Sequence, residues 1–158
     1  MASVLKKFAT FLLVAVCYSS VAQKTVEEEE LSFSVLSGLY ENYPNVQSAV
    51  WRENQTKLGA QYQVSFEFEK QRYKVILDSR GKRIGELRYL SSTPIDIINV
   101  LYEQFDQFKI KEVAVKTVFP SKEKSYIATI KGKSFGIQNI ELDENIKPIS
   151  NNVALNQN

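Results

Sequence analysis

Apolar and polar residues alternate with a period of two along several short stretches of the chain, which predicts β-strands. The clearest stretch is 61–69, where tyrosine, valine and phenylalanine occupy the even positions and glutamine, serine and glutamate the odd ones. Residues 72–78 repeat this alternation after a short polar turn. The other predicted strands are 46–52, 82–90, 110–119, 125–131 and 135–142. Because short turns separate most of these strands, we expect neighbours to pair antiparallel, as in a meander.

Two other stretches have apolar residues at the helical spacing i, i+3, i+4 and i+7. These residues are Leu36, Leu39, Tyr40 and Tyr43 in the first stretch and Ile98, Leu101, Tyr102 and Phe105 in the second. The first helix is predicted over residues 31–42, because Pro44 disfavours helical backbone just before it. The second begins near Thr93, which suits the N-cap, and Pro94, which suits the first helical position. We expect the tyrosines of both stripes to lie in the core.

The order of these elements occurs twice along the chain. Residues 39–43 match 101–105 at an offset of 62, residues 62–66 match 126–130 at an offset of 64, and Leu77-Asp78 matches Leu142-Asp143 at an offset of 65. A shared period of this length indicates that one supersecondary unit was duplicated. The two units are predicted at 31–90 and 93–149.

The repeat determines the predicted fold class. An amphipathic helix has to cover an apolar sheet face with its stripe. We therefore predict an α+β fold, in which duplicated helix-plus-antiparallel-meander units form one sheet with two helices on one face. The other face carries the polar residues of the alternation and is expected to stay open to water.

A series of short motifs resembles a known family. In chain order they are Tyr43-Pro44-Asn45, Trp51, Tyr62-Gln63-Val64-Ser65-Phe66, and Asp78-Ser79-Arg80-Gly81-Lys82. Their order is similar to that of the PepSY-like domain, also called β-lactamase-inhibitor-like or BLIP-like, of exported Bacteroidetes proteins. The resemblance covers about residues 31–149 and implies a non-catalytic module; related domains bind proteins or act as inhibitors. The second unit departs from the pattern, with Asp106, Val115 and Ile146 near the family's proline, tryptophan and glycine positions.

The first 22 residues have the composition of a cleavable signal peptide. Lys6 and Lys7 precede a run of small and apolar residues over 8–16, and Ser20 and Ala22 suit the −3 and −1 positions of a cleavage site. The run is shorter than the roughly 20 residues of a membrane-spanning helix, so a retained anchor is the weaker alternative. We expect a periplasmic or secreted protein with no stable membrane span after cleavage.

The segments on either side of the predicted domain 31–149 differ from it in composition. Residues 23–30 form an acidic lead-in, in which Thr25 and Glu28 have the spacing of a helix capping box. A solvated linker fits these residues equally well. Residues 150–158 are polar and rich in asparagine, so we expect a flexible tail.

Composition limits the chemistry that the protein can perform. The chain has no histidine, and its one cysteine, Cys17, lies in the predicted signal peptide. This excludes Ser–His–Asp and Cys–His nucleophilic centres, and also the usual zinc, copper and haem ligand sets. The six glycines form no phosphate-binding loop. We therefore expect a protein that is not an enzyme and that binds no cofactor or metal.

Charge argues against nucleic acid as a partner. The chain has 20 Lys and Arg residues and 18 Asp and Glu residues. Lys6 and Lys7 lie in the predicted signal peptide, so the basic excess disappears with it. A neutral mature domain has no electrostatic reason to bind nucleic acid or anionic lipid.

Several single residues invite a chemical interpretation. Glu67 and Glu86 could form a hydrolytic pair, but both lie in alternating strands, and a solvated sheet face is the preferred interpretation. Asp78 and Asp143 lack the repeated oxygen ligands of a calcium loop and are interpreted as turn residues. Trp51 could stack a ligand, but burial against the first helix is preferred.

The open sheet face is the predicted binding site. Gln63, Ser65 and Glu67 on one strand would lie beside Arg72 and Lys74 on the next, giving a surface of mixed charge and hydrogen-bonding groups. Such a face can bind an unidentified envelope or secreted protein through charge complementarity. The alternative is that it is only the solvated side of a half-buried sheet.

Two functions remain open at this point. The first is a protein-binding or inhibitor-like module that uses the open face. The second is a carrier of a small apolar ligand, with a cavity between helices and sheet that the aromatic residues Phe66, Phe68, Tyr73 and Phe135 would permit. A cavity of several hundred cubic ångströms there would favour the carrier.

Overall fold

The structure, a computed structural model, describes residues 23–149. Eight strands form one antiparallel sheet in chain order. They are β1 (Lys24–Val26), β2 (Gln47–Thr56), β3 (Gly59–Phe68), β4 (Gln71–Asp78), β5 (Arg83–Tyr89), β6 (Phe108–Val118), β7 (Glu123–Gly132) and β8 (Gly136–Leu142). The helices are α1 (Phe33–Tyr40), α2 (Ile95–Gln104) and the short 3₁₀ helix η1 (Glu28–Glu30). The α+β class with a single antiparallel sheet is confirmed, whereas the predicted signal peptide and tail lie outside the described residues.

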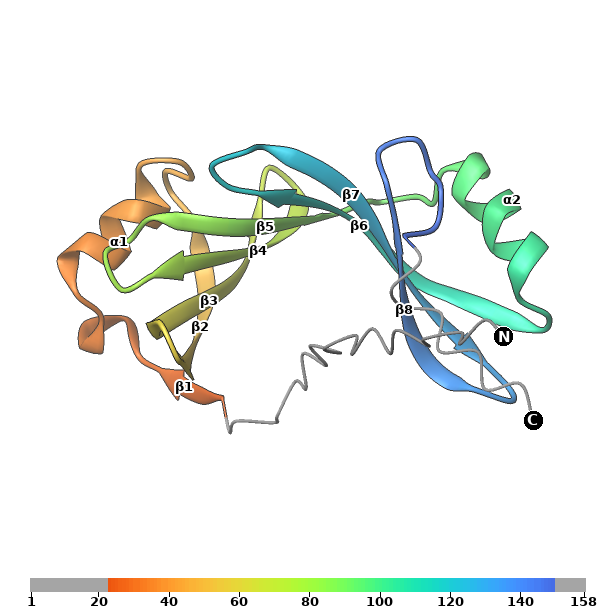
Figure 1. The fold of residues 1–158 in the computed structure, drawn as a ribbon. Helices are drawn as coiled ribbons and strands as arrows, with labels where there is room; N and C mark the ends of the chain where they lie inside the picture. The colour runs from red at the N-terminus through yellow and green to blue at the C-terminus, as the bar shows by residue number, and fades with distance from the viewer. Residues whose placement is uncertain (1–22, 150–158) are drawn as a thin grey trace, which may run out of the picture.

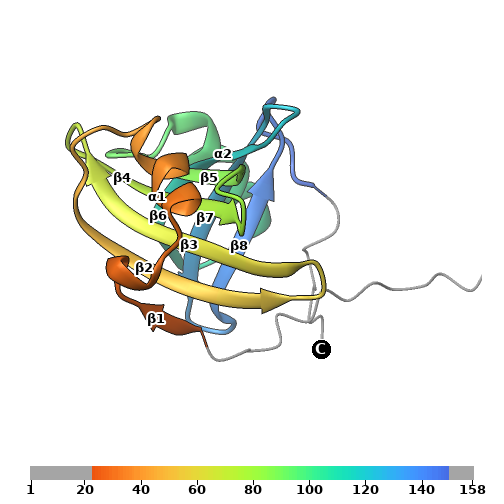
Figure 2. The same ribbon diagram turned by 90° about the vertical axis from the view of Figure 1, so that its left-hand side faces the viewer.

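The sheet is arched, and the two helices lie on its outer side near opposite ends (Figure 1). α1 lies near the end formed by the first strands, and α2 near the end formed by the last strands. The view from the α1 end shows this helix in front of the curved sheet (Figure 2). Within residues 23–149, no helix is long and apolar enough to cross a membrane.

Strand register places both helices' contacts on the same face of the sheet. Val75 faces Glu86 on β5, and Glu86 faces Thr117 on β6. Facing residues share one side of a sheet, as do residues two apart on one strand. Val115 therefore lies on the same side as Thr117, and so does its partner Tyr126 on β7. Because Val75 packs beneath α1 and Tyr126 packs with the core around α2, the outer face is continuous across both halves.

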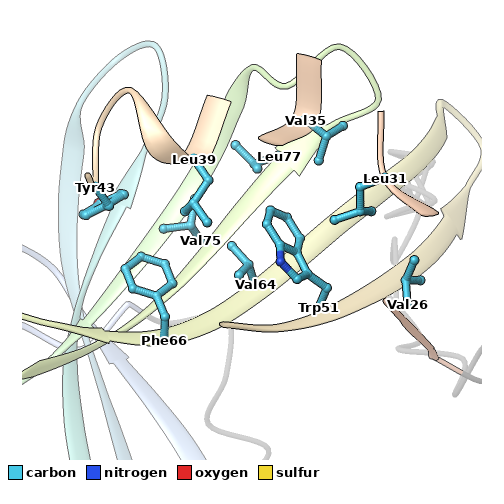
Figure 3. Close-up of a cluster of buried hydrophobic side chains, with 10 residues drawn as sticks. All are labelled: Val26, Leu31, Val35, Leu39, Tyr43, Trp51, Val64, Phe66, Val75 and Leu77. Atoms are coloured by element: carbon cyan, nitrogen blue, oxygen red, sulfur yellow. The ribbon is translucent and has the colours of Figure 1, made fainter. Parts of the chain in front are cut away.

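The first core fills the space between α1 and strands β1 to β4 (Figure 3). Its buried members are Val26, Leu31, Val35, Leu39, Tyr43, Trp51, Val64, Phe66, Val75 and Leu77. α1 begins where the Ser32 hydroxyl accepts a hydrogen bond from the Val35 backbone N–H, at 3.4 Å. Trp51 is only 2% exposed, so its predicted place in the core is confirmed.

The second core joins α2 to strands β6 to β8. Its buried members are Ile97, Leu101, Phe108, Val113, Ala128, Ile130, Ile140 and Leu142. The predicted stripe was one residue out of phase, because α2 buries Ile97 as well as Leu101 and leaves Tyr102 65% exposed. The prediction that Tyr102 lies in the core was therefore wrong. Pro94, not Thr93, is the N-cap, and the helix begins at Ile95.

Residues 23–30 belong to the fold rather than to a linker. β1 pairs with β2, and Val26 faces Trp51 across this pair. Burial of Val26 in the first core explains why a polar segment adds a strand to the sheet. The expected capping of Thr25 by Glu28 is not what forms; the Glu30 carboxylate instead accepts a hydrogen bond from the Glu27 backbone N–H, at 3.3 Å.

Asp78 and Asp143 form two turns with the same hydrogen bonds. Asp78 Oδ1 accepts from the backbone N–H groups of Arg80 and Lys82, each at 2.9 Å. Asp143 Oδ1 accepts from those of Asn145 and Lys147, at 2.9 and 2.8 Å. Side chains that bind their own backbone in this way are characteristic of Asp in turns, so the turn interpretation of both aspartates is confirmed.

α1 rests directly on the backbone of the Asp78 turn. A Cβ atom added to Gly38 would lie 1.9 Å from the carbonyl oxygen of Gly81. A Cβ added to Gly81, whose φ is +80°, would lie 1.9 Å from the carbonyl oxygen of Ser34. Two glycines therefore allow the helix to approach the turn more closely than any side chain would permit.

We expect Gly38→Ala to lower the free energy of unfolding by ~1–3 kcal/mol, because the methyl group has to push the helix away from the turn. Elsewhere in a helix, replacement of glycine by alanine usually stabilises by up to about 1 kcal/mol, so the predicted sign is reversed. Urea denaturation measures the change. Gly85→Ala is the control, because its nearest heavy atom would lie 3.7 Å away. Equal stability losses in the two variants would contradict this packing.

Candidate functional site

The inner face of the arch contains a hollow of about 1000 Å³, lined by residues from β2 to β6 and the adjoining turns. All five residues predicted from sequence line it: Gln63, Ser65, Glu67, Arg72 and Lys74. Strict alternation on β3 and β4 explains their common side, since Ser65 faces Lys74 and Glu67 faces Arg72 in the register. The hollow is thus on the face opposite the two cores.

The centre of this inner face is apolar, which the sequence interpretation missed. Tyr89 on β5 faces Ala114 on β6, and Ala114 faces Ile127 on β7. Ala114 is only 3% exposed, while Tyr89 and Ile127 are half-buried. Leu87 belongs to the same side, because it faces Lys74. We call Leu87, Tyr89, Ala114 and Ile127 the apolar floor.

A sequence signal for the apolar floor does exist. Residues 113–115 are all aliphatic, and residues 126–128 are Tyr-Ile-Ala, so both runs are apolar on consecutive positions. A strand with consecutive apolar residues presents apolar side chains on both of its faces. The polar character expected for the whole open face was therefore wrong for its central strands.

Charged side chains border the floor in an arrangement that spans three strands. The Arg72 guanidinium on β4 lies 4.7 Å from the centre of the Tyr89 ring on β5. It also forms an ion pair with Glu112 on β6, with 3.2 Å between nitrogen and oxygen. Arg72 therefore reaches over β5 and connects the two halves of the sheet on its inner face.

A second ion pair lies toward the other end of the inner face. Glu141 on β8 accepts hydrogen bonds from Lys116 Nζ at 2.9 Å and from the Ser125 hydroxyl at 2.8 Å. Burial alone would raise the pKa of Glu141, but these hydrogen bonds and the Lys116 charge outweigh it and hold the pKa below its usual value. The stability that Glu141 contributes is present at neutral pH and is lost as pH falls through this lowered pKa.

Glu67 and Glu86 do not form a carboxylate pair, because they lie on opposite faces. Glu86 was interpreted as part of a solvated sheet face, and this was wrong. Its carboxylate accepts hydrogen bonds from the Tyr43 hydroxyl and from Arg83 on the outer face. Burial of the Tyr43 hydroxyl, followed by its hydrogen bond to Glu86, raises the pKa of Tyr43. These groups hold α1 and β5 together rather than forming a reaction centre.

The space between the helices and the sheet is filled by side chains. Tyr43 packs edge-on against Phe66 and Phe68, with ring centres 4.9 and 5.5 Å apart, and Phe135 packs against Phe105 at 5.5 Å. The hollow that the structure does contain lies on the other face. The carrier interpretation, which requires a cavity beneath the helices, is therefore not supported. Within residues 23–149, no three His, Cys, Asp or Glu side chains gather closely enough to hold a metal ion.

The molecule is thus an α+β protein with an arched antiparallel sheet, helices outside and a hollow inside. Three solved structures with this fold resemble it. A BLIP-like protein from Bacteroides fragilis aligns with a TM-score of 0.59 and 14% identity over 75% of this chain and 83% of that chain. A DUF2874 family protein from Bacteroides uniformis gives 0.63, 13%, 75% and 86% for the same quantities. Another, from Bacteroides ovatus, gives 0.57, 16%, 72% and 80%.

These structures confirm the BLIP-like resemblance at the level of the fold. No protein-family model matches the sequence, and a search of curated proteins finds no match either.

We expect Lys116→Met to raise the pKa of Glu141, because the desolvation that remains favours the protonated carboxyl. Carboxyl ¹³C NMR across an acid titration measures this pKa. Lys124→Met removes the same charge from the opposite side of the sheet, since Lys124 faces Thr117, and should leave the Glu141 pKa unchanged. A pKa that stays low in Lys116→Met, or rises equally in both variants, would contradict the ion pair.

Proposed function

We propose that the protein is an exported, non-catalytic binding module that docks a protein partner on the inner face of the arch. The observation that carries the proposal is the meeting, at one hollow of about 1000 Å³, of the five predicted residues with the edge of the apolar floor. An apolar centre with a polar rim is the usual composition of a protein–protein interface. A convex surface of a partner fits an arch of this kind better than a flat one.

The fold likeness supports an inhibitor-like role within this proposal. The Bacteroides fragilis structure is described as BLIP-like, and its fold extends over 75% of this chain. A fold by itself names no target, so the partner is proposed only as an envelope or secreted protein. Export rests on the signal-peptide composition of residues 1–22 and is compatible with the Bacteroides structures.

We also propose that the two halves arose by duplication. Each half has a helix, a buried cluster and an antiparallel run of strands ending in an Asp turn. The matching hydrogen bonds of Asp78 and Asp143 support a common origin. The halves have diverged where α1 meets its turn, because Gly38 and Gly81 correspond to Val100 and Ile146 in the second half.

Reversal of two charges on the inner face tests the proposed interface. Arg72→Glu with Lys74→Glu is expected to reduce retention of a captured protein at least about tenfold, because like charges now meet at the docking surface. The tagged protein is incubated with an envelope fraction, and the retained proteins are quantified by mass spectrometry. Arg72→Gln with Lys74→Gln, a milder change, should give a smaller loss.

Lys133→Glu with Lys147→Glu is the matched control, because both lysines are exposed in turns away from the hollow. It should retain the partner as the wild type does, and thermal unfolding shows whether each variant is folded. Equal retention by all variants would contradict the proposed interface. Co-purification of an apolar small molecule without any protein partner would contradict it as well.

A further inference from the structure

The inner face carries one half-buried cation without a carboxylate partner. Lys74 lies at the middle of β4, between Ser65 on β3 and Leu87 on β5. Within residues 23–149, Lys74 takes part in no ion pair of 4.0 Å or less, whereas Arg72 and Lys116 on the same face are paired with Glu112 and Glu141. The ammonium group of Lys74 is therefore the open electrostatic position of the hollow.

The surroundings of Lys74 make it receptive to a carboxylate. Ser65 offers a hydroxyl beside it, and Leu87 gives its other side an apolar boundary. A partner that covers this position removes water, which strengthens the attraction between opposite charges and makes an unpaired ammonium costly. A carboxylate bound to Lys74, with a further hydrogen bond from Ser65, satisfies both requirements.

The remaining charges argue against a nucleic-acid strand as occupant. A phosphate backbone requires several free cations along its path. Here two of the cations are already neutralised by Glu112 and Glu141, and Glu67 adds a negative charge beside Lys74. One free ammonium next to an apolar floor suits a single acidic side chain with an apolar neighbour.

We infer that the partner inserts a protruding loop into the arch, with an Asp or Glu carboxylate on Lys74 and an adjacent aromatic or aliphatic side chain on the apolar floor. This inference rests on the proposed function and adds the chemistry of the partner to it. The acidic residue provides recognition, since a basic or neutral loop leaves Lys74 unpaired on binding. The apolar residue provides most of the buried area.

A selection from random loops tests this chemistry without knowledge of the natural partner. A phage library of disulfide-constrained loops is selected on the purified protein. Loops that bind are expected to combine Asp or Glu with an adjacent aromatic or aliphatic residue. Lys74→Glu should weaken them at least about tenfold, and replacement of the acidic loop residue by lysine should restore binding to Lys74→Glu but not to the wild type.

Lys133→Glu is the matched control, and it should bind the selected loops as the wild type does. Lys74→Gln serves as a second variant and should lose an intermediate share of the affinity. Loops that compete with one another at Arg72 and Tyr89 but are insensitive to Lys74 would overturn the acidic-residue inference and leave the proposed interface standing. Loops that bind away from the inner face would overturn both.

Discussion

Pairing between β5 and β6 is the interaction on which the rest of the architecture depends. Five facing pairs, from Gly85 with Val118 to Tyr89 with Ala114, join the two sets of strands into one sheet. Each set carries its own buried cluster and its own helix. Because side chains alternate between faces, this single register places both clusters on the outer side and leaves the inner side continuous. A slip of one residue would put one cluster on the face where the partner is proposed to bind.

Side chains reinforce this junction on both faces of the sheet. On the inner face Arg72 spans β5 to reach Glu112, and on the outer face the Arg83 guanidinium lies 4.3 Å from the centre of the Phe119 ring. An exposed ion pair alone contributes little to stability. Two bridging arginines on opposite faces nevertheless restrict how the halves can rotate. The arch is therefore shaped before a partner arrives, which reduces the entropy lost on binding.

The sequence predicted what depends on local periodicity and missed what depends on docking. Alternation on β3 and β4 was enough to place Ser65 and Lys74 on one face, because a period of two leaves no other choice. The phase of α2 was missed, since its rotation is set by the fit of Ile97 against the second sheet half. Consecutive apolar residues around Ala114 do not tell which face is covered. Ion pairs between distant strands, such as that of Lys116, require the folded register.

The central claim is that one continuous sheet has both helices on its outer side and an uncovered inner face. Methyl NOE measurements on Ala114 test it most directly, because this small residue lies at the β5–β6 junction and points inward. The account predicts NOEs from the Ala114 methyl group to Tyr89 and Ile127 and none to the α2 residues Ile97 and Leu101. NOEs from Ala114 to either of these α2 residues would contradict it, since a helix would then cover the inner face.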